Sequence, residues 1–205
     1  MVSGRIDQLT TASARTAPLS RERIRAALRP TPPPLRASDP SLRPAAVLMP
    51  IVERDEPSVL FTRRTEHLPS HAGQICFPGG RYHPDDKTLI QTALREVEEE
   101  IGLPPATVEV AGFLDSHETL NTGFAILPVV GFLRADFLLL VNAQEVAEVF
   151  EAPLAYILDP NNHVRRTVER EGVMREFYAI DYGTHTIWGA TAAMIVNLSE
   201  RLGLR

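Results

Sequence analysis

Apolar residues recur in short runs from about residue 45 onward, and their spacing predicts strands and helices in alternation. Runs rich in β-branched and aromatic residues predict strands over 45–53, 59–63, 108–114 and 125–133. The turn-like segment 55–58 joins the first two as a hairpin, and Glu171-Gly172 joins 164–170 to 173–181 as another. Helical spacing predicts helices over 88–101, 144–158 and 188–202. Helices interleaved with hairpins indicate an α+β fold, an α/β/α sandwich in which helices flank a mixed β-sheet.

Residues 1–44 differ from the rest of the chain in composition. They hold seven of the 17 prolines, and eight arginines against three acidic residues. Ser20 is a suitable N-cap for one short helix that ends before the proline run. We therefore expect an arm over 1–44 and one domain over 45–205. The arm is expected to be a surface helix held against the domain, with a dimerisation arm or an organellar transit peptide as alternatives.

Composition limits the class of protein and the class of partner. The chain has 205 residues, 44% of them hydrophobic, which is typical of a globular domain. No apolar run reaches the roughly 18–20 residues of a membrane span, and no signal peptide is evident, so we expect a cytoplasmic protein without membrane contact. The formal net charge of -5 argues against nucleic acid as a partner. An anionic small molecule would have to be bound by local groups of arginine.

The helix predicted over 88–101 carries an unusual group of acids. With about 100° per residue, Glu96, Glu99 and Glu100 fall on one side of it, whereas Glu98 falls beyond its apolar stripe. Like charges at this spacing repel each other, and the macrodipole disfavours them at a helix C-terminus. A hard divalent cation such as Mg²⁺ or Mn²⁺ would relieve that repulsion, and Arg95 is placed to hold one carboxylate. The alternative is a solvated acidic face.

The segment around these acids resembles the Nudix box. Residues 95–103, Arg-Glu-Val-Glu-Glu-Glu-Ile-Gly-Leu, match the end of that motif, and Phe77-Pro78-Gly79-Gly80 precedes the helix. Asp86 stands where the general motif has glutamate, and one extra residue separates it from Arg95.

In both departures the sequence resembles the form of the motif found in the coenzyme A pyrophosphatase branch of the family. That branch has a second, upstream signature, which resembles Leu-Phe-Thr-Arg-Arg-Thr at 60–65 and His-Ala-Gly-Gln at 71–74. Pro69 stands where the signature often has an arginine.

The resemblance implies the Nudix fold and a set of site residues. Metal ligands would be Glu96, Glu99, Glu100 and the carbonyl of Gly79. Catalytic residues would be Arg95, Glu99 and Glu145, with Glu118 and Glu148 as alternative proton acceptors and water as the nucleophile. Substrate-binding residues would be Arg64, Thr62, His71, Gly73 and Gln74. Arg63 and Arg64 alternate in direction along a strand, so only one of them is expected in the site.

The function implied is metal-dependent hydrolysis of a pyrophosphate bond in a nucleoside diphosphate derivative. The favoured substrate is coenzyme A or acyl-CoA, cleaved to 3′,5′-ADP and (acyl-)4′-phosphopantetheine. ADP-ribose, NADH or a nucleoside triphosphate is the alternative substrate, and a non-catalytic ligand-sensing module is the alternative of another class. A homodimer is expected from the family. Cys76 and Trp188 are both expected to be buried structural residues, although Trp188 could also stack on a base.

Overall fold

The computed structural model describes residues 19–35, 39–68, 71–119, 122–170 and 172–205, so Pro69, Glu171 and the first 18 residues of the expected arm lie outside the described residues. Within these ranges, eight strands form the central sheet in the order β3-β2-β1-β7-β5, with β4 on β1, β6 on β7 and β8 on β2. Only β1 and β7 run parallel, so the sheet is mixed, as predicted. The strands are β1 (Arg43–Glu53), β2 (Ser58–Arg64), β3 (Ile75–Cys76), β4 (Gly79–Arg81), β5 (Val108–Phe113), β6 (His117–Thr119), β7 (Phe124–Arg134) and β8 (Val146–Pro153).

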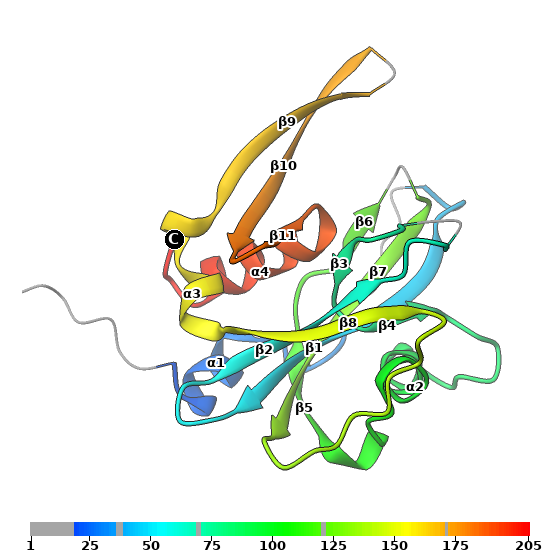
Figure 1. The fold of residues 1–205 in the computed structure, drawn as a ribbon, viewed down its shortest axis with the longest axis vertical. Coiled ribbons are helices and arrows are strands. Elements are labelled where there is room, and N and C mark those ends of the chain that lie inside the picture. Colours follow the sequence, from blue (N-terminus) through cyan, green and yellow to red (C-terminus); the bar gives the residue numbers. More distant parts are fainter. Residues whose placement is uncertain (1–18, 36–38, 69–70, 120–121, 171) are drawn as a thin grey trace, which may run out of the picture.

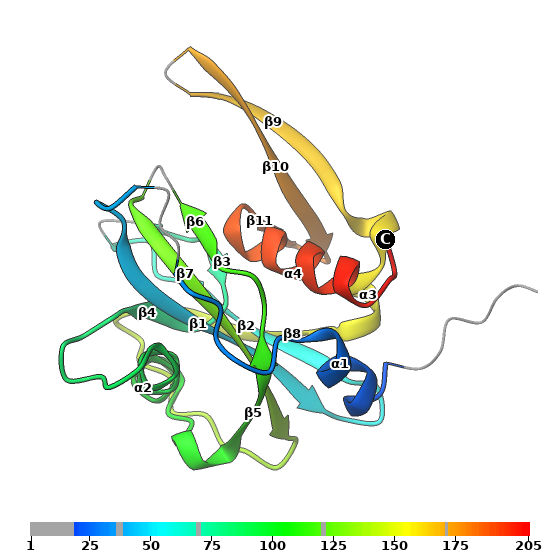
Figure 2. The same cartoon turned by 180° about the vertical axis from the view of Figure 1, so that it is seen from behind.

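Alternate residues of β1 enter two different cores. Leu48 and Val52 pack in the cluster beneath α2 (Leu89–Ile101), whereas Met49 and Ile51 pack in the cluster on the other face. That second cluster also contains residues of α1 (Arg21–Ala27), α3 (Leu154–Leu158) and α4 (Ala190–Arg201). Figures 1 and 2 show α2 on one side of the sheet and α1 and α4 on the other. The period-two alternation of a strand thus separates two apolar layers, and the predicted α/β/α sandwich is confirmed.

A second, smaller sheet stands against the first. It contains β9 (Val164–Arg170), β10 (Val173–Tyr182) and β11 (His185–Trp188), all antiparallel. The β9–β10 hairpin confirms the predicted one and projects from the body of the molecule (Figure 1). Two short 3-10 helices, Pro105–Thr107 and Pro160–Asn162, complete the described elements.

Two helix predictions were wrong in extent. The segment 144–158 was expected to be one helix, but Val146–Pro153 is strand β8 and only Leu154–Leu158 is helical. The antiparallel partner β2 supplies backbone hydrogen bonds from a distant part of the chain and overrides the local helical spacing. The last helix was expected from residue 188, but Trp188 ends strand β11 and the helix begins at Ala190.

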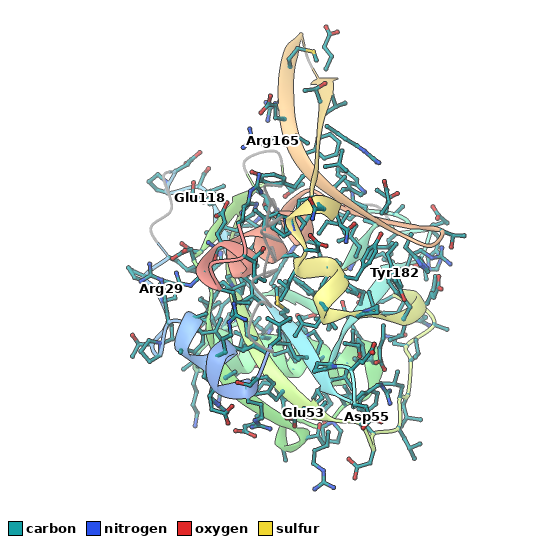
Figure 3. All side chains as sticks on the ribbon, turned by 90° about the vertical axis from the view of Figure 1, so that its left-hand side faces the viewer. Arg29, Glu53, Asp55, Glu118, Arg165 and Tyr182 are labelled. Carbon is teal, nitrogen blue, oxygen red and sulfur yellow. The ribbon has the colours of Figure 1, made fainter. Side chains whose placement is uncertain are left out.

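Helix α1 is integrated into the packing of the domain. Its predicted cap is confirmed, because the Ser20 hydroxyl accepts a hydrogen bond from the Arg23 backbone. Ile24 lies in the core beneath α4. Just beyond α1 lies Arg29, which is labelled in Figure 3. It forms an ion pair with Asp115, which also pairs with Arg201 of α4. The expected boundary after residue 44 falls inside β1, which begins at Arg43.

No helix in the described ranges is long and apolar enough to cross a membrane.

Candidate active site

Helix α2 has local signals at both ends and along one face. Thr88 caps its N-terminus by accepting a hydrogen bond from the Gln91 backbone, and Gly102 ends it in the left-handed region at φ 73°. Its apolar stripe, which includes Val97, is buried in the core beneath the sheet. The predicted helix over 88–101 is therefore confirmed to within one residue, and its polar face is left for the acids.

A loop before β8 closes the C-terminal end of α2. The backbone N–H of Leu140 donates to the carbonyl of Ile101, and that of Asn142 donates to the carbonyl of Glu100, each over 2.9 Å. These bonds satisfy carbonyl groups that a helix end leaves without partners. The loop continues to Glu145, and the side-chain amide of Asn142 lies 3.5 Å from its carboxylate. The turn that caps the helix thus brings a further acid to it.

Glu100 lies at the buried centre of this acidic group. Its side chain is 3% exposed, and its nearest cation is Arg64, with 3.9 Å between Nη1 and Oε1. Burial, together with the neighbouring Glu96 and Glu145, raises the pKa of Glu100 to about 8 against the opposing effect of Arg64. The Oε2 atom of Glu100 has no hydrogen-bond partner among the described residues. A buried carboxylate with an unpaired oxygen is costly, so this position favours a cationic ligand.

The glycine pair of β4 makes room for the acids. A Cβ on Gly80 would lie 2.5 Å from the carboxylate carbon of Glu96, and a Cβ on Gly79 would lie 2.6 Å from the Cα of Val47 on β1. Burial raises the pKa of Glu96, with Arg95 opposing the shift. Backbone hydrogen bonding from Gly79 acts in the opposite sense on Glu100 and favours its charged form. A side chain at Gly80 would therefore displace Glu96 from the acidic cluster, defined here as Glu96, Glu99, Glu100 and Glu145, whereas one at Gly79 would collide with β1.

Arg95 connects Asp86 to the acidic cluster. Its guanidinium contacts Asp86 through two bonds of 3.0 Å, Glu96 at 2.9 Å and Glu99 at 2.8 Å. Asp86 also accepts a hydrogen bond from the Thr92 hydroxyl at 2.8 Å, and its pKa is lowered to about 2, chiefly by the bonds from Arg95. Arg95 therefore contacts three carboxylates where the sequence predicted one, whereas the exposed Glu98 lies outside these contacts.

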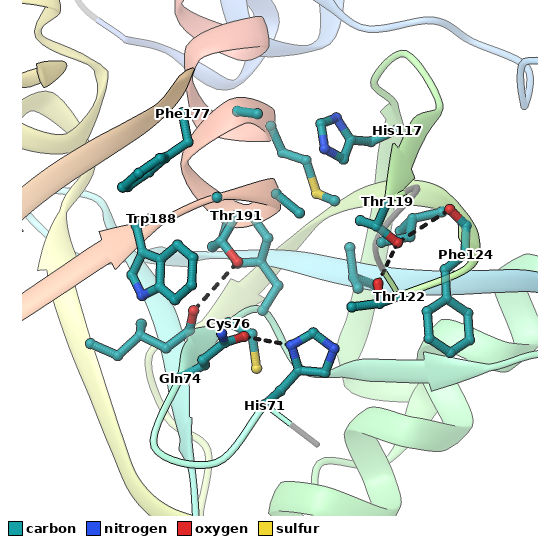
Figure 4. Close-up of a pocket in the computed structure, with 18 of the residues that line it drawn as sticks. His71, Gln74, Cys76, His117, Thr119, Thr122, Phe124, Phe177, Trp188 and Thr191 are labelled. Atoms are coloured by element: carbon teal, nitrogen blue, oxygen red, sulfur yellow. Dashed lines mark hydrogen bonds between the residues drawn. The ribbon is translucent and has the colours of Figure 1, made fainter. Parts of the chain in front are cut away.

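A cavity of about 860 Å³ lies beside the acidic cluster, and residues that contact the acids line it. Its lining includes Gly80, which adjoins Glu96, and Arg64, which pairs with Glu100. On other sides it is bounded by β6, by the start of α4 and by the β9–β10–β11 sheet (Figure 4). Small-molecule sites range over roughly 300–1,000 Å³, so the cavity has room for a large nucleotide derivative.

Residues 42–169 match the family model of the NUDIX domain. The chain belongs to the Nudix family. A relative from Yersinia pestis (strain Pestoides F), named an uncharacterized Nudix hydrolase NudL, is 42% identical over 162 residues, 79% of this chain and 81% of the relative. A relative of the same name from Yersinia pseudotuberculosis serotype O:1b gives the same values.

A solved structure supports the fold alone. The MutT/nudix family protein from Enterococcus faecalis aligns with a TM-score of 0.52 at 17% identity, over 82% of this chain and 64% of that one. The present chain is thus a Nudix pyrophosphohydrolase, an enzyme acting on nucleoside diphosphate derivatives. Members of the family generally use a divalent cation such as Mg²⁺ or Mn²⁺.

The acidic cluster fits such a cation in chemistry, although its acids are not preassembled around one point. Among the described residues, no three His, Cys, Asp or Glu side chains form a ready metal-binding group. Arg95 ion-pairs with two of the acids, Glu96 and Glu99. The unpaired oxygen of Glu100 and the concentration of carboxylate oxygens are nevertheless what Mg²⁺ and Mn²⁺ require.

Three of the five predicted substrate-binding residues of this Nudix domain line the cavity. Arg64 does so from the end of β2, and His71 and Gln74 do so from the following loop, where their side chains lie 2.6 Å apart (Figure 4). Arg63 faces elsewhere and binds Glu148 at 2.9 Å. The geometry therefore agrees with the expectation that one of the two arginines reaches the site.

Thr62 and Gly73 are corrections. Thr62 is 1% exposed, and its hydroxyl lies 3.4 Å from the carbonyl oxygen of Cys76, so it supports the strand pair beneath the cavity. Gly73 adopts φ 67°, and a Cβ there would meet the carboxylate of Glu66, so it serves a tight turn. Cys76 itself lies at the cavity wall, and burial raises the pKa of its thiol to about 11. A thiol of that pKa is a poor nucleophile, as expected.

The three candidate proton acceptors differ in their surroundings. Glu145 is close enough to Glu96 and Glu100 to raise the pKa of both. Glu118 lines the cavity from β6. Glu148 instead binds Arg63 and lies 3.1 Å from His185, and these contacts lower its pKa.

Phe177 was not singled out from the sequence, and Trp188 was expected mainly in the core, with stacking on a base as the alternative. Trp188 is 41% exposed and lines the cavity together with Phe177, so the expected core role of Trp188 was wrong. The sequence signal for a place at the cavity was the position of Trp188 at the end of a strand, directly before Gly189. The sequence prediction instead placed Trp188 at the start of a helix. His117 also lines the cavity, and burial lowers its pKa, which favours the neutral ring.

Proposed function

We propose that this Nudix enzyme hydrolyses the pyrophosphate bond of coenzyme A or acyl-CoA, with Mg²⁺ or Mn²⁺, to 3′,5′-ADP and (acyl-)4′-phosphopantetheine. The observation that carries the proposal is a cavity beside the acidic cluster whose lining combines Arg64 and Arg81 with apolar side chains. A substrate with a diphosphate at its centre, a nucleotide on one side and an extended chain on the other matches that lining. The upstream signature at 60–65 and 71–74 points to the same substrate class.

We assign the residues as follows. Glu96, Glu99, Glu100 and the carbonyl of Gly79 would hold the cation, which supplies charge neutralisation of the diphosphate and a more acidic water. Arg95 orients Glu96 and Glu99 through its ion pairs. Arg64, beside Glu100 at the cavity wall, would bind a phosphate oxygen.

The reaction needs one proton acceptor and no covalent protein intermediate. The oxygen of water forms a new bond to phosphorus while the bridging P–O bond breaks, and the displaced phosphate leaves with the bridging oxygen. Glu145, which adjoins Glu96 and Glu100, is our candidate for taking the proton of that water.

Two alternatives have specific support. Pro69 stands where the signature often has an arginine, and the absence of a basic residue there favours ADP-ribose, NADH or a nucleoside triphosphate as substrate over coenzyme A. A non-catalytic ligand-sensing module would also keep the cavity. The complete set of Arg95 and its acids argues against that module, since sensing does not require it.

The test is product analysis by mass spectrometry. The protein is incubated with Mg²⁺ or Mn²⁺ and a mixture of coenzyme A, ADP-ribose, NADH and nucleoside triphosphates. We expect 3′,5′-ADP to appear fastest. Faster release of another product pair would replace the substrate, and absence of any cleavage would favour the sensing module.

We also propose that the chain forms a homodimer, as expected from the family. Light scattering on the full-length chain should give twice the monomer mass. The same measurement on a variant that lacks the arm shows whether the arm is needed for the dimer. A monomeric full-length chain would contradict this.

A further inference from the structure

The β9–β10–β11 sheet presents an aromatic pair to the cavity. Trp188 ends β11 and Phe177 lies on the adjacent β10, with 5.6 Å between ring centroids and 62° between ring planes. Figure 4 shows both rings at the same side of the pocket, above the loop that carries His71 and Gln74. A T-shaped contact covers at most one face of a ring, so Phe177 leaves indole surface facing the cavity.

The exposure of Trp188 is not explained by packing. Tryptophan is among the residues that gain most from burial, yet 41% of this one is accessible, and it is one of the residues that line the cavity. Its backbone is held in the sheet. Trp188 pairs with Ala179 in the register, and the next N–H, that of Gly189, donates to the carbonyl of Tyr178 at 3.1 Å. An exposed ring on a fixed backbone is a preorganised stacking surface.

The surroundings of the pair favour a nucleobase over an apolar chain. Arg175 lies two residues before Phe177 on β10, so it shares the sheet face of both rings and brings positive charge to that part of the cavity lining. Arg165 of β9 also lines the cavity but lies on the opposite face, where it pairs with Glu176 at 3.6 Å. Other large rings of the cavity are already covered: the guanidinium carbon of Arg43 lies 4.4 Å from the centroid of Phe124, that of Arg165 lies 5.4 Å from the centroid of Tyr178, and Phe77 is buried. Aromatic surface together with cations is the combination that binds a planar base with attached phosphates.

We propose that Trp188 stacks on the adenine base of the nucleotide half of the substrate, and that Phe177 is a positioning residue that holds the indole. The inference rests on the proposed function in one respect only, that the ligand is an adenine nucleotide. It assigns the two halves of coenzyme A to different parts of the cavity, with the base at the hairpin sheet and the pantetheine arm elsewhere.

The chain offers a direct probe, because Trp188 is its only tryptophan and intrinsic fluorescence reports on that ring alone. The full-length protein is titrated, without metal, with 3′,5′-ADP and separately with 4′-phosphopantetheine. We expect saturable quenching by 3′,5′-ADP and at least about tenfold weaker apparent affinity in the 4′-phosphopantetheine titration. No quenching by 3′,5′-ADP, or equal quenching by both, would overturn the assignment.

Variants provide a second measurement that separates stacking from structure. Trp188→Ala should raise the KM for coenzyme A about 5- to 100-fold with little change in kcat, whereas Trp188→Phe should recover most of that loss by restoring a ring. Phe177→Ala should shift the Trp188 emission before any ligand is added. An unchanged KM in Trp188→Ala would reject the stacking role even if coenzyme A is the substrate. Quenching by 3′,5′-ADP in a protein that does not cleave coenzyme A would support the stacking role and reject the proposed substrate.

Discussion

At the scale of single residues, the acidic cluster depends on Asp86 and Arg95, two residues outside the cluster. Asp86 is buried and receives two bonds from Arg95, which in turn reaches Glu96 and Glu99. A buried carboxylate that is fully bonded to a guanidinium is a rigid anchor, because moving either partner would leave an unpaired charge. The acids are therefore positioned from outside as well as from the helix backbone.

We predict that Asp86→Asn destabilises the fold by about 2 kcal/mol at neutral pH, since the pKa of Asp86 is lowered from its ordinary value of about 3.9 to about 2. A depressed folded-state pKa gives stability that is present above pH 4 and is lost as pH falls toward 2. The difference in unfolding free energy between the two proteins should shrink over that window in urea titrations. Asp85→Asn is the matched control, because Asp85 is almost fully exposed, and it should change stability by less than about 0.5 kcal/mol. A pH-independent difference would contradict the anchor.

Gly80 is a second residue whose effect is exerted on the cluster. In Gly80→Ala the new Cβ would lie 2.5 Å from the carboxylate of Glu96, which is the mobile end of a side chain and can move aside. We predict a fall in kcat/KM of about tenfold or more with a change in unfolding free energy below about 1 kcal/mol. Turnover and urea unfolding measured on the same preparation check this, and an equal loss of both would mean that Gly80 serves the fold alone.

At the scale of elements, the C-terminal end of α2 and the loop before β8 form one unit. Gly102 adopts φ 73°, and a Cβ there would lie 2.6 Å from the Cβ of Leu140 and 2.9 Å from its backbone nitrogen. That nitrogen donates to the last turn of the helix. Crowding at Gly102 would therefore disturb the loop that ends in Glu145.

We predict that Gly102→Ala destabilises the fold by about 1 kcal/mol more than Gly203→Ala. Both glycines are in the left-handed region, so both substitutions incur the same backbone strain of about 1–2 kcal/mol, but a Cβ on Gly203 would meet nothing within 4 Å. Thermal or urea unfolding of the two variants measures the difference. Equal destabilisation by the two substitutions would show that the loop at Leu140 can move without loss of unfolding free energy.

The elements also show which parts of the fold can be predicted from sequence. Helix α2 was predicted to within a residue because its cap at Thr88, its stripe and its end at Gly102 are all local signals. Strand β8 was missed because β2, which pairs with it, lies far away in sequence. The same limit applies to the site. The acids of α2 follow from helical spacing, whereas the cavity wall at Trp188 follows from the docking of a separate sheet.

At the scale of the whole molecule, α1 is part of the structure that supports the cavity. Ile24 is 1% exposed and lies in the same core as α4, which contributes Thr191 and Met194 to the cavity lining. Asp115 joins the two through ion pairs with Arg29 and Arg201. The segment that follows the arginine-rich start of the chain is thus tied to the helix behind the site.

We predict that Ile24→Ala lowers the unfolding free energy by about 2–4 kcal/mol, because it opens a cavity between the sheet and α4, whereas Ile24→Val costs about 1 kcal/mol. Thermal unfolding at fixed protein concentration measures both. A loss below about 0.5 kcal/mol for the alanine variant would show that α1 can detach without affecting the core.

The central claim is that the acids on one face of α2 carry the hydrolysis. The direct measurement is cation-dependent turnover of coenzyme A by Glu100→Gln and by Glu98→Gln, two acids of one helix two residues apart, of which only Glu100 is buried against Arg64. We predict that Glu100→Gln loses at least about 100-fold in kcat at saturating Mg²⁺ while Glu98→Gln stays within about twofold of the original chain. Turnover retained by Glu100→Gln, or lost equally by both variants, would contradict the account.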